Sequence, residues 1–410
     1  MGDPGAAPGP LWRNRDFHKF WLAQSVSRLG TTASEFVVPV LALAVTGSAA
    51  VAGALVALQQ LPYLVIGLLV GVLADRVSRK RIIVVGSLVQ VVLAGFVAVT
   101  AWHRQLDLLQ LGVVAVLIGT AFVFTDVADG AAFPSVVPRE QLPRATFLAE
   151  GALSVAELGG PALGGLLLGW AATAEQGAGL VFGFDAATYC VAAVLIALVG
   201  RGLVPPPGDG GRRSPVAELR TGLRFLWRHP ALRVLAISNF ASIVLLAPVG
   251  LTIIVSATTR FGASATVAGL LFTVGGVGGL VGVAAMSLLQ RHLTPVAMMV
   301  FACASWAAGM VVIASSPSVT WLVVGWAVIS AMYPAYFSTL YAYRARLTPE
   351  ALQGRVNSAY RILSQAGGPV GTLAGGWLLT RSGPQFTATV AAAAFVANLV
   401  YVVIRAPRQR

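Results

Sequence analysis

The sequence predicts an all-α membrane protein with twelve transmembrane helices in two pseudo-symmetric six-helix bundles. Of its 410 residues, 57% are apolar and only 10% are charged, and the mean hydropathy is +0.81. Soluble domains carry about a quarter charged residues, whereas apolar runs of about 18 or more residues are typical of bilayer spans. Such runs recur along the whole chain. They must be helices, because a lone strand would leave its backbone polar groups unpaired in hydrocarbon and the runs lack the alternation of a barrel.

The apolar runs divide the chain into two bundles, 20–200 and 233–404. A cytoplasmic N-terminal tail, 1–19, precedes them, a cytoplasmic linker, 201–232, joins them, and a short cytoplasmic tail, 405–410, follows. No short apolar core precedes a cleavage site, so we expect no removable signal peptide and expect the first span to direct insertion. In chain order the predicted spans are 20–45, 51–73, 82–101, 108–126, 145–170, 179–200, 233–257, 265–289, 294–314, 318–341, 355–380 and 385–404.

Lysine and arginine are distributed very unequally between the two ends of these spans. Of the 28 Lys and Arg residues, 24 lie in the tails and connections of one side, and only Arg104, Arg260 and Arg381 lie on the other. The positive-inside bias therefore predicts a multi-pass protein of the cell membrane with both termini in the cytoplasm. The net charge of +13 follows from this topology. We expect no nucleic-acid partner, since no basic patch with interleaved aromatics lies outside the membrane regions.

The linker begins with a Pro- and Gly-rich stretch and ends in an amphipathic segment, 214–229. In that segment Arg220, Arg224 and Arg228 recur every four residues, and apolar residues occupy another face. This pattern predicts a basic helix lying on the inner leaflet. Two roles remain open for it, an anchor for the linker and a lipid-specific site.

The two halves resemble each other in sequence. Gly159-Gly160-Pro161 recurs as Gly367-Gly368-Pro369, and Pro-Glu, Leu and Arg residues precede both at similar spacing, with an offset of 208 to 211 residues. Because both termini lie on one side, two copies of six helices imply a parallel repeat about an axis along the membrane normal. Such repeats are typical of transporters with a site between the halves.

Two motifs carry a family resemblance. The connection after the second span reads Gly71-Val72-Leu73-Ala74-Asp75-Arg76-Val77-Ser78-Arg79-Lys80-Arg81. It resembles the loop signature of the major facilitator superfamily, with Ser78 where that signature usually has glycine. The fifth span contains Gly160-Pro161-Ala162-Leu163-Gly164-Gly165, which resembles the antiporter motif of that superfamily's drug exporters. The resemblance covers nearly the whole chain, is strongest to the drug efflux and enterobactin exporter-like branch, and implies the major facilitator fold.

The resemblance implies a cytoplasmic gate at the loop motif. Asp75 is placed to accept hydrogen bonds from the first turn of the eleventh helix and to meet Arg355 or Arg361. Asp126 or Asp129 would complete this latch by pairing with a loop arginine. Alternatively the arginines only orient the protein, but orientation does not require an aspartate among them, which favours gating. The gating residues would be Gly71, Asp75, Arg76, Arg79 and Arg81.

Charges within the spans point to a polar cavity, because each is costly in lipid unless it is paired or faces water. Arg28 and Glu35 lie seven residues apart on one face of the first span, and Glu150 and Glu157 have the same spacing in the fifth. Glu35 is the first candidate for carrying an exchanged proton and Glu157 the second. The alternative is a structural ion pair with Arg28 or a neighbouring residue. For Asp185, helix capping and cavity lining both remain open.

The sequence and the resemblance together predict a secondary transporter that exports a small amphipathic molecule by alternating access in exchange for protons. A siderophore-specific exporter, an uptake permease of the same fold and a non-transporting receptor or scaffold remain alternatives. The fourth span lacks the arginine that drug exporters of the superfamily often carry there, so Arg28 is the candidate to replace it. We expect a monomer that needs no cofactor.

Several function classes are disfavoured. The four histidines lie in loops or at span ends, and the spans contain neither HExxH nor GxSxG, so the chain is not expected to be an enzyme. Cys190 and Cys303 are isolated in apolar runs, which argues against a disulfide framework or a metal site. No phosphate-binding loop of the form GxxxxGK[ST] occurs, so energy must come from an ion or substrate gradient.

Overall fold

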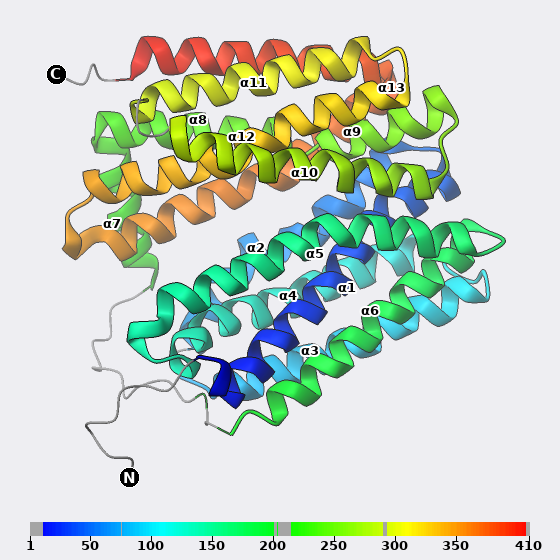
Figure 1. Cartoon of the computed structure of the whole chain (residues 1–410), viewed down its shortest axis with the longest axis horizontal. Helices are drawn as coiled ribbons and strands as arrows, with labels where there is room; N and C mark the ends of the chain where they lie inside the picture. The colour runs from blue at the N-terminus through cyan, green and yellow to red at the C-terminus, as the bar shows by residue number, and fades with distance from the viewer. Residues whose placement is uncertain (1–10, 75, 201–202, 204–214, 290–292, 407–410) are drawn as a thin grey trace. The chain divides into compact units, whose positions relative to one another are not determined.

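The computed structural model describes residues 11–74, 76–200, 203, 215–289 and 293–406, and these form helices without strands (Figure 1). The prediction of an all-α membrane protein is therefore confirmed. The α-helices are α1 (Arg15–Thr46), α2 (Ala49–Ala74), α3 (Arg79–Trp102), α4 (Leu108–Val136), α5 (Leu142–Trp170), α6 (Ala174–Ala197), α7 (Pro215–Arg228), α8 (Pro230–Leu246), α9 (Val249–Val255), α10 (Ala265–Leu289), α11 (Pro295–Ser315), α12 (Val319–Leu347) and α13 (Gln353–Arg405). Short helical turns lie at Leu11–Arg13, Arg139–Gln141, Ser256–Arg260 and Glu350–Leu352.

All twelve predicted spans fall on these helices. Within the described residues, ten helices are long and apolar enough to cross a membrane. The smaller number arises because α13 contains the last two predicted spans, and only 265–279 of α10 is counted, as a shorter apolar helix. Gly383, with φ 77° and ψ 170°, kinks α13 between those two spans. Only glycine reaches that backbone conformation at little cost, so this residue allows the chain to reverse between two helices without a loop.

Polar side chains set the starts of several helices. Asp107 accepts a hydrogen bond from the backbone N–H of Gln110, whose side chain accepts one from the N–H of Asp107, and this capping box begins α4. Thr173 caps α6 and Thr294 caps α11 in the same way, by accepting from backbone N–H groups. These bonds satisfy N–H groups that would otherwise have no partner at the helix ends.

The chain groups into two compact units, residues 1–35 with 65–211 and residues 36–64 with 212–410. Segment 36–64, the end of α1 and the first part of α2, therefore packs with the C-terminal helices. The Ala50 N–H donates to Thr380 Oγ1 at 2.7 Å, and Gly53 lies against the backbone of α13. The predicted bundle boundaries, 20–200 and 233–404, are not tested by this grouping and stay a prediction.

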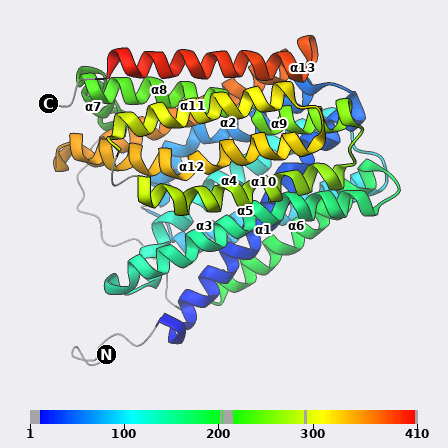
Figure 2. The same cartoon turned by 45° about the horizontal axis from the view of Figure 1, so that its top comes forward.

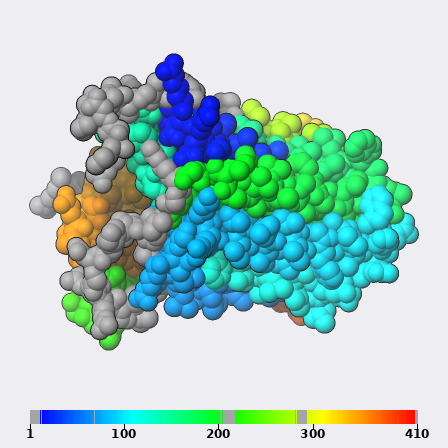
Figure 3. All heavy atoms as spheres, turned by 90° about the horizontal axis from the view of Figure 1, so that it is seen from below, coloured from blue at the N-terminus to red at the C-terminus, as the bar shows by residue number. Residues whose placement is uncertain are grey.

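In the first unit, α3 and α6 lie side by side along their length (Figures 1 and 3). One face of α3 exposes apolar side chains at helical spacing, namely Val85, Leu88, Val92, Phe96 and Val99. On a soluble protein such a stripe would be an aggregation hazard, but in a bilayer it is the expected lipid-facing surface. The polar side chains Ser87 and Gln90 of the same helix are buried.

The second unit is built from α7–α13 and the adjoining parts of α1 and α2. Figure 2 shows α11, α12 and α13 running along one another, and their core centres on three aromatic rings. Trp306 packs edge-on against Tyr336 with ring centroids 4.7 Å apart and also contacts Phe395 at 5.6 Å. All three side chains are buried.

The predicted amphipathic helix of the linker is present as α7. It runs across the ends of α12 and α13 in Figure 1, whereas α11, α12 and α13 of the same unit run along one another. Residues 201–202 and 204–214, which include the Pro- and Gly-rich stretch, lie outside the described residues.

Candidate functional site

A row of polar side chains follows one face of α1 through the first unit. We call it the α1 polar stripe, and it consists of Gln24, Ser27, Arg28, Thr31, Ser34 and Glu35. These residues recur every three or four positions, which places them on one side of a helix over about 16 Å. In a helix that crosses a membrane, such a stripe requires partners on the neighbouring helices, because unpaired polar groups are costly away from water.

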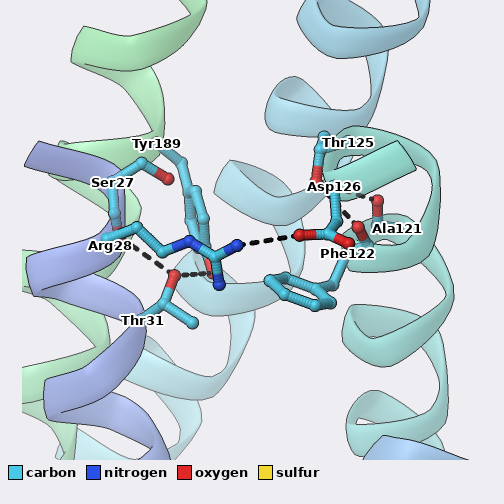
Figure 4. Close-up of polar contacts among 8 residues, drawn as sticks. All are labelled: Ser27, Arg28, Thr31, Ala121, Phe122, Thr125, Asp126 and Tyr189. Atoms are coloured by element: carbon cyan, nitrogen blue, oxygen red, sulfur yellow. Dashed lines mark hydrogen bonds and ion pairs between the residues drawn. The ribbon is translucent and has the colours of Figure 1, made fainter. Parts of the chain in front are cut away.

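The central contact of the stripe is an ion pair between α1 and α4. Arg28 Nη2 donates to Asp126 Oδ1 at 2.8 Å, and the guanidinium also lies 5.0 Å from the centroid of the Phe122 ring (Figure 4). We expected Asp126 or Asp129 to meet an arginine of the loop motif, and the structure gives Asp126 a partner on α1 that we did not predict. In this ion pair the basic residue lies on α1 and the acidic residue on α4. An arginine in the fourth span would place the basic residue on α4 instead.

This ion pair borders a polar cavity inside the first unit. The cavity contains about 390 Å³ of space not filled by atoms, part of it open to solvent. Its walls come from α1, α3, α4 and α6. The lining residues are Gln24, Ser27, Arg28, Thr31, Ile83, Ser87, Gln90, Phe122, Thr125, Asp126, Asp129, Tyr189, Ala192 and Ile196. Ten of these fourteen are polar or charged, so the cavity suits water, ions or polar groups.

A second carboxylate, Asp129, lies one helical turn from Asp126 in the same cavity. Its side chain lies close to Gln24 of the α1 polar stripe. Its Oδ1 atom is buried and has no hydrogen-bond partner among the described residues. A buried oxygen without a partner is uncommon in a folded protein and marks a position where a proton, a water molecule or a ligand group would be stabilised.

The far end of the stripe meets α6. Ser34 Oγ donates to Asp185 Oδ2 at 2.7 Å, and Thr188 Oγ1 lies 3.4 Å from Asp185 Oδ1. Only 1% of Asp185 is exposed. Gly30 makes this approach possible, because a Cβ atom there would lie 2.6 Å from Asp185 Oδ1. Asp185 therefore lines the contact between α1 and α6, and the capping alternative is wrong, since Thr173 caps α6.

Tyr189 lies one turn along α6 from Asp185. Its hydroxyl shares a 2.8 Å hydrogen bond with Thr31 Oγ1 (Figure 4). Three members of the α1 polar stripe thus bond to acids or hydroxyls of α4 and α6. The regular spacing of polar residues in the first span is the sequence signal for this arrangement, although only Arg28 and Glu35 of that span are predicted as cavity residues.

The two predicted proton carriers lie near this ion pair. Glu35 on α1 and Glu157 on α5 are exposed, and both are close enough to Arg28 to be attracted by its charge. Glu35 also lies within electrostatic range of Glu157 and Asp185. Of the four predicted cavity residues, Arg28 lines the polar cavity. Glu35, Glu157 and Asp185 are not among its lining residues, and they lie within electrostatic range of Arg28 or of one another.

The antiporter motif of α5 packs against α1. A Cβ atom on Gly160 would collide with Thr32, and one on Gly164 would lie 2.7 Å from the carbonyl oxygen of Ala33. Thr32 Oγ1 also donates to the carbonyl of Ala156 at 2.9 Å. These small residues allow the two backbones to approach closely, as in other membrane helix pairs. Pro161 and Gly165 complete the motif, and Gly165 is buried.

The loop motif joins the ends of three helices in the first unit. Arg79 Nη1 donates to the carbonyl oxygen of Ala131 on α4 at 2.8 Å, and Lys80 Nζ donates to the carbonyl of Val199 after α6 at 2.8 Å. A Cβ atom on Gly71 would meet no heavy atom within 4 Å, so no close contact requires glycine there.

The remaining loop residues give less structural information. Arg76 and Arg81 are exposed. Asp75, the proposed centre of the gate, lies outside the described residues. Its candidate partner Arg355 forms a 3.7 Å ion pair with Glu218 of α7, and the guanidinium of Arg361 lies 5.0 Å from the centroid of the Tyr63 ring.

The second unit contains polar groups but almost no acids. From residue 230 onward, Glu350 is the only acidic residue of the sequence. Asn239 Nδ2 donates to Ser364 Oγ at 2.7 Å, while Asn239 Oδ1 and the Tyr360 hydroxyl are buried without hydrogen-bond partners in the described part of the chain. Acid chemistry within the spans is therefore confined to the N-terminal half.

Comparison with known sequences gives the family. The sequence model described as "Transmembrane secretion effector", of the major facilitator superfamily, matches residues 6–409. The chain is 27% identical to the multidrug efflux pump Tap of Mycolicibacterium fortuitum, over 85% of each protein. It is 25% identical to macrolide efflux protein A of Streptococcus pyogenes over 53% of this chain and 52% of that protein.

Solved structures agree on the fold. The nucleoside transporter NupG superposes with a TM-score of 0.74 at 11% identity, covering 96% of this chain and 100% of that one. A bacterial homologue of the iron transporter ferroportin, in an inward-facing state, gives a TM-score of 0.77 at 18% identity, covering 97% and 100%. The predicted major facilitator fold is thus confirmed. The chain is a multi-pass membrane transporter and not an enzyme, and it belongs to the transmembrane secretion effector family of the major facilitator superfamily.

Proposed function

We propose that the protein exports a small amphipathic molecule by alternating access, in exchange for protons that move inward. The observation that carries the proposal is the grouping of Arg28, Asp126 and Asp185 with the exposed acids Glu35 and Glu157 in the first unit. Charged groups at membrane depth are expensive and normally serve ion or substrate movement. The printed names of the relatives, a multidrug efflux pump and a macrolide efflux protein, support export.

Glu35 is the proposed first proton carrier and Glu157 the second. Both are exposed, and both interact electrostatically with Arg28. When either acid binds a proton, it loses its negative charge and no longer attracts Arg28. Arg28 then interacts mainly with Asp126. Proton binding would thus be coupled to the contact between α1 and α4, which is a physical route from the ion to the helices. Asp185 would hold α6 to α1 during this exchange through Ser34.

The loop motif is proposed to gate the cytoplasmic side, with Asp75 as its central acid. The arginines of the motif would hold the helix ends together, as Arg79 does with the carbonyl of Ala131. An Asp75→Asn variant should increase cytoplasmic thiol labelling of a cysteine placed at Ser27 in the α1 polar stripe. Equal labelling of the Asp75→Asn variant and of the protein with Asp75 would contradict the proposed gate.

The proposed orientation places both termini in the cytoplasm of a cell-membrane protein, and the proposed active form is a monomer. The uneven distribution of Lys and Arg supports the orientation. Protease protection of a tag at each terminus in right-side-out vesicles checks it, because both tags should resist digestion until the membrane is opened.

Transport in proteoliposomes tests the function. Purified protein would be reconstituted, a pH gradient imposed, and movement of ethidium, an amphipathic cation, followed by fluorescence. With the wild type, we expect ethidium to move in the direction opposite to that of the protons. With Glu35→Gln, we expect no such movement. Glu150→Gln is the matched control, because Glu150 is also an exposed acid of a span, and it should keep transport. If transport is equally fast without a pH gradient, proton exchange is not the energy source.

A further inference from the structure

The linker helix α7 is fixed to the second unit by one face. Leu226 is fully buried in the core of that unit. Gly222 lies directly on the first turns of α13, where a Cβ atom would be only 2.6 Å from the carbonyl carbon of Arg355. Glu218 points to the same place and pairs with Arg355 at 3.7 Å. These contacts determine which side of α7 faces the protein.

The opposite face of α7 carries three arginines and a tryptophan. Arg220, Arg224 and Arg228 recur every four residues and are all exposed, and 43% of Trp227 is exposed. Four residues advance a helix by about 6 Å, so the three side chains leave α7 in a row of about 12 Å. The one acid of α7, Glu218, is turned toward Arg355, so no carboxylate of α7 neutralises this row.

The structure separates two roles that the sequence left open. Attachment of the linker is accomplished by the face with Gly222 and Leu226. The arginines are not needed for it, because the described residues give them no ion pair with the protein. They stand in a fixed row on a helix that runs across the ends of α12 and α13 (Figure 1).

We propose that the Arg220–Arg224–Arg228 face of α7 binds the phosphate groups of anionic phospholipids in the surrounding bilayer. The argument is charge complementarity and position. Spans that run along one another place their ends at the membrane surface, and a helix lying across those ends is held at the level of the lipid headgroups. Guanidinium groups match phosphate oxygens in geometry as well as in charge, and an exposed tryptophan beside them is typical of the interfacial region.

Binding of this kind would strengthen the attachment of α7 to α13. A lipid that bridges the arginine row to the bilayer binds the assembled protein and not the unfolded chain, so it would raise the apparent stability of the second unit. The proposal does not depend on export or on protons, and its experiment needs no transport activity.

The test counts phosphatidylglycerol molecules bound to the detergent-solubilised full-length protein by native mass spectrometry. Arg220→Gln, Arg224→Gln and Arg228→Gln combined should weaken binding by roughly 100-fold, and each alone by about fivefold, since each basic residue contributes similarly at an anionic surface. Replacing all three by Lys keeps the charge and should retain most of the binding. The control removes three exposed arginines elsewhere, Arg13, Arg346 and Arg405, and should leave the affinity within about twofold.

A second measurement uses the wild-type fold. The wild-type signal minus that of Trp227→Phe gives the fluorescence of Trp227. Brominated phosphatidylglycerol should quench this fluorescence more strongly than brominated phosphatidylcholine does, and salt should reduce the preference for phosphatidylglycerol. Equal quenching by the two lipids would overturn the proposal. So would an equal loss of binding in the control variant, or competition by inorganic phosphate at the same affinity, which would indicate a site for free anions.

Discussion

Arg28 Nη2 lies 2.8 Å from Asp126 Oδ1, and this ion pair joins α1 to α4 in the first unit. The two side chains are 31% and 27% exposed, so both have lost most of their contact with solvent. Removing one partner leaves the other charge partly buried and unpaired, which costs more than the pair itself contributes. The pair is therefore a point at which stability and proposed transport are both affected.

Asp126→Asn should lower the free energy of unfolding by about 2 kcal/mol, a value reduced from that of a fully buried pair because solvent still reaches both groups. It should also reduce transport driven by a pH gradient. Thermal unfolding in detergent and the ethidium assay measure the two effects. The double variant Arg28→Asp with Asp126→Arg restores opposite charges and should recover part of the stability. A double variant no more stable than Asp126→Asn would show that the pairing contributes little.

Gly164→Ala should destabilise the protein by about 1–3 kcal/mol, because the added Cβ would lie 2.7 Å from the carbonyl oxygen of Ala33 and must push α5 away from α1. Gly71→Ala is the matched control. It adds the same methyl group to a helix where no heavy atom lies within 4 Å, and it should be neutral or slightly stabilising. Melting temperatures in one detergent compare the two. Similar losses in both variants would contradict the close contact of α5 with α1.

Ser34→Ala should cost about 1–3 kcal/mol, because it removes a donor from the buried carboxylate of Asp185. The control is Ser154→Ala, whose hydroxyl bonds to a carbonyl of its own helix at an exposed position, and this change should have little effect. Hydrogen exchange of α6 provides a local measurement. Faster exchange there in Ser34→Ala alone would locate the loss at the contact of α1 with α6.

Gly383→Ala should destabilise the protein by about 1–2 kcal/mol, since residue 383 has a φ of 77° that side chains with a Cβ rarely adopt. The nearby Ser382→Ala, in ordinary helical backbone, serves as the control. Thermal unfolding distinguishes the two, and an unchanged melting temperature for Gly383→Ala would mean that the kink tolerates any residue.

The sequence predicted the fold well because the bilayer allows few solutions. Apolar runs of about twenty residues can only be helices in lipid, and all twelve fell on helices, with the amphipathic segment found as α7. Helix ends were less well placed. The fourth predicted span stopped at Asp126, but α4 continues to Val136, and Asp126 within it pairs with Arg28.

The site was predicted only in part. Arg28, Glu35, Glu157 and Asp185 are predicted because an isolated charge in a span is conspicuous, and of these Arg28 lines the polar cavity. Ser34, Thr31 and Tyr189 were missed as site residues, because a single hydroxyl in a membrane helix commonly bonds to its own backbone. Which hydroxyls instead face another helix depends on the rotation of α1 against α4 and α6. Packing sets that rotation, and periodicity within one helix does not.

The α1 polar stripe restricts how its neighbours can move. Ser34 and Thr31 bond to α6 while Arg28 bonds to α4, so a slide of α1 by one turn, about 5.4 Å, would break all three bonds together. Rotation of a single side chain breaks only one of them. In the proposed proton exchange, single hydroxyl and carboxyl groups can therefore reorient while α1 keeps its position against α4 and α6.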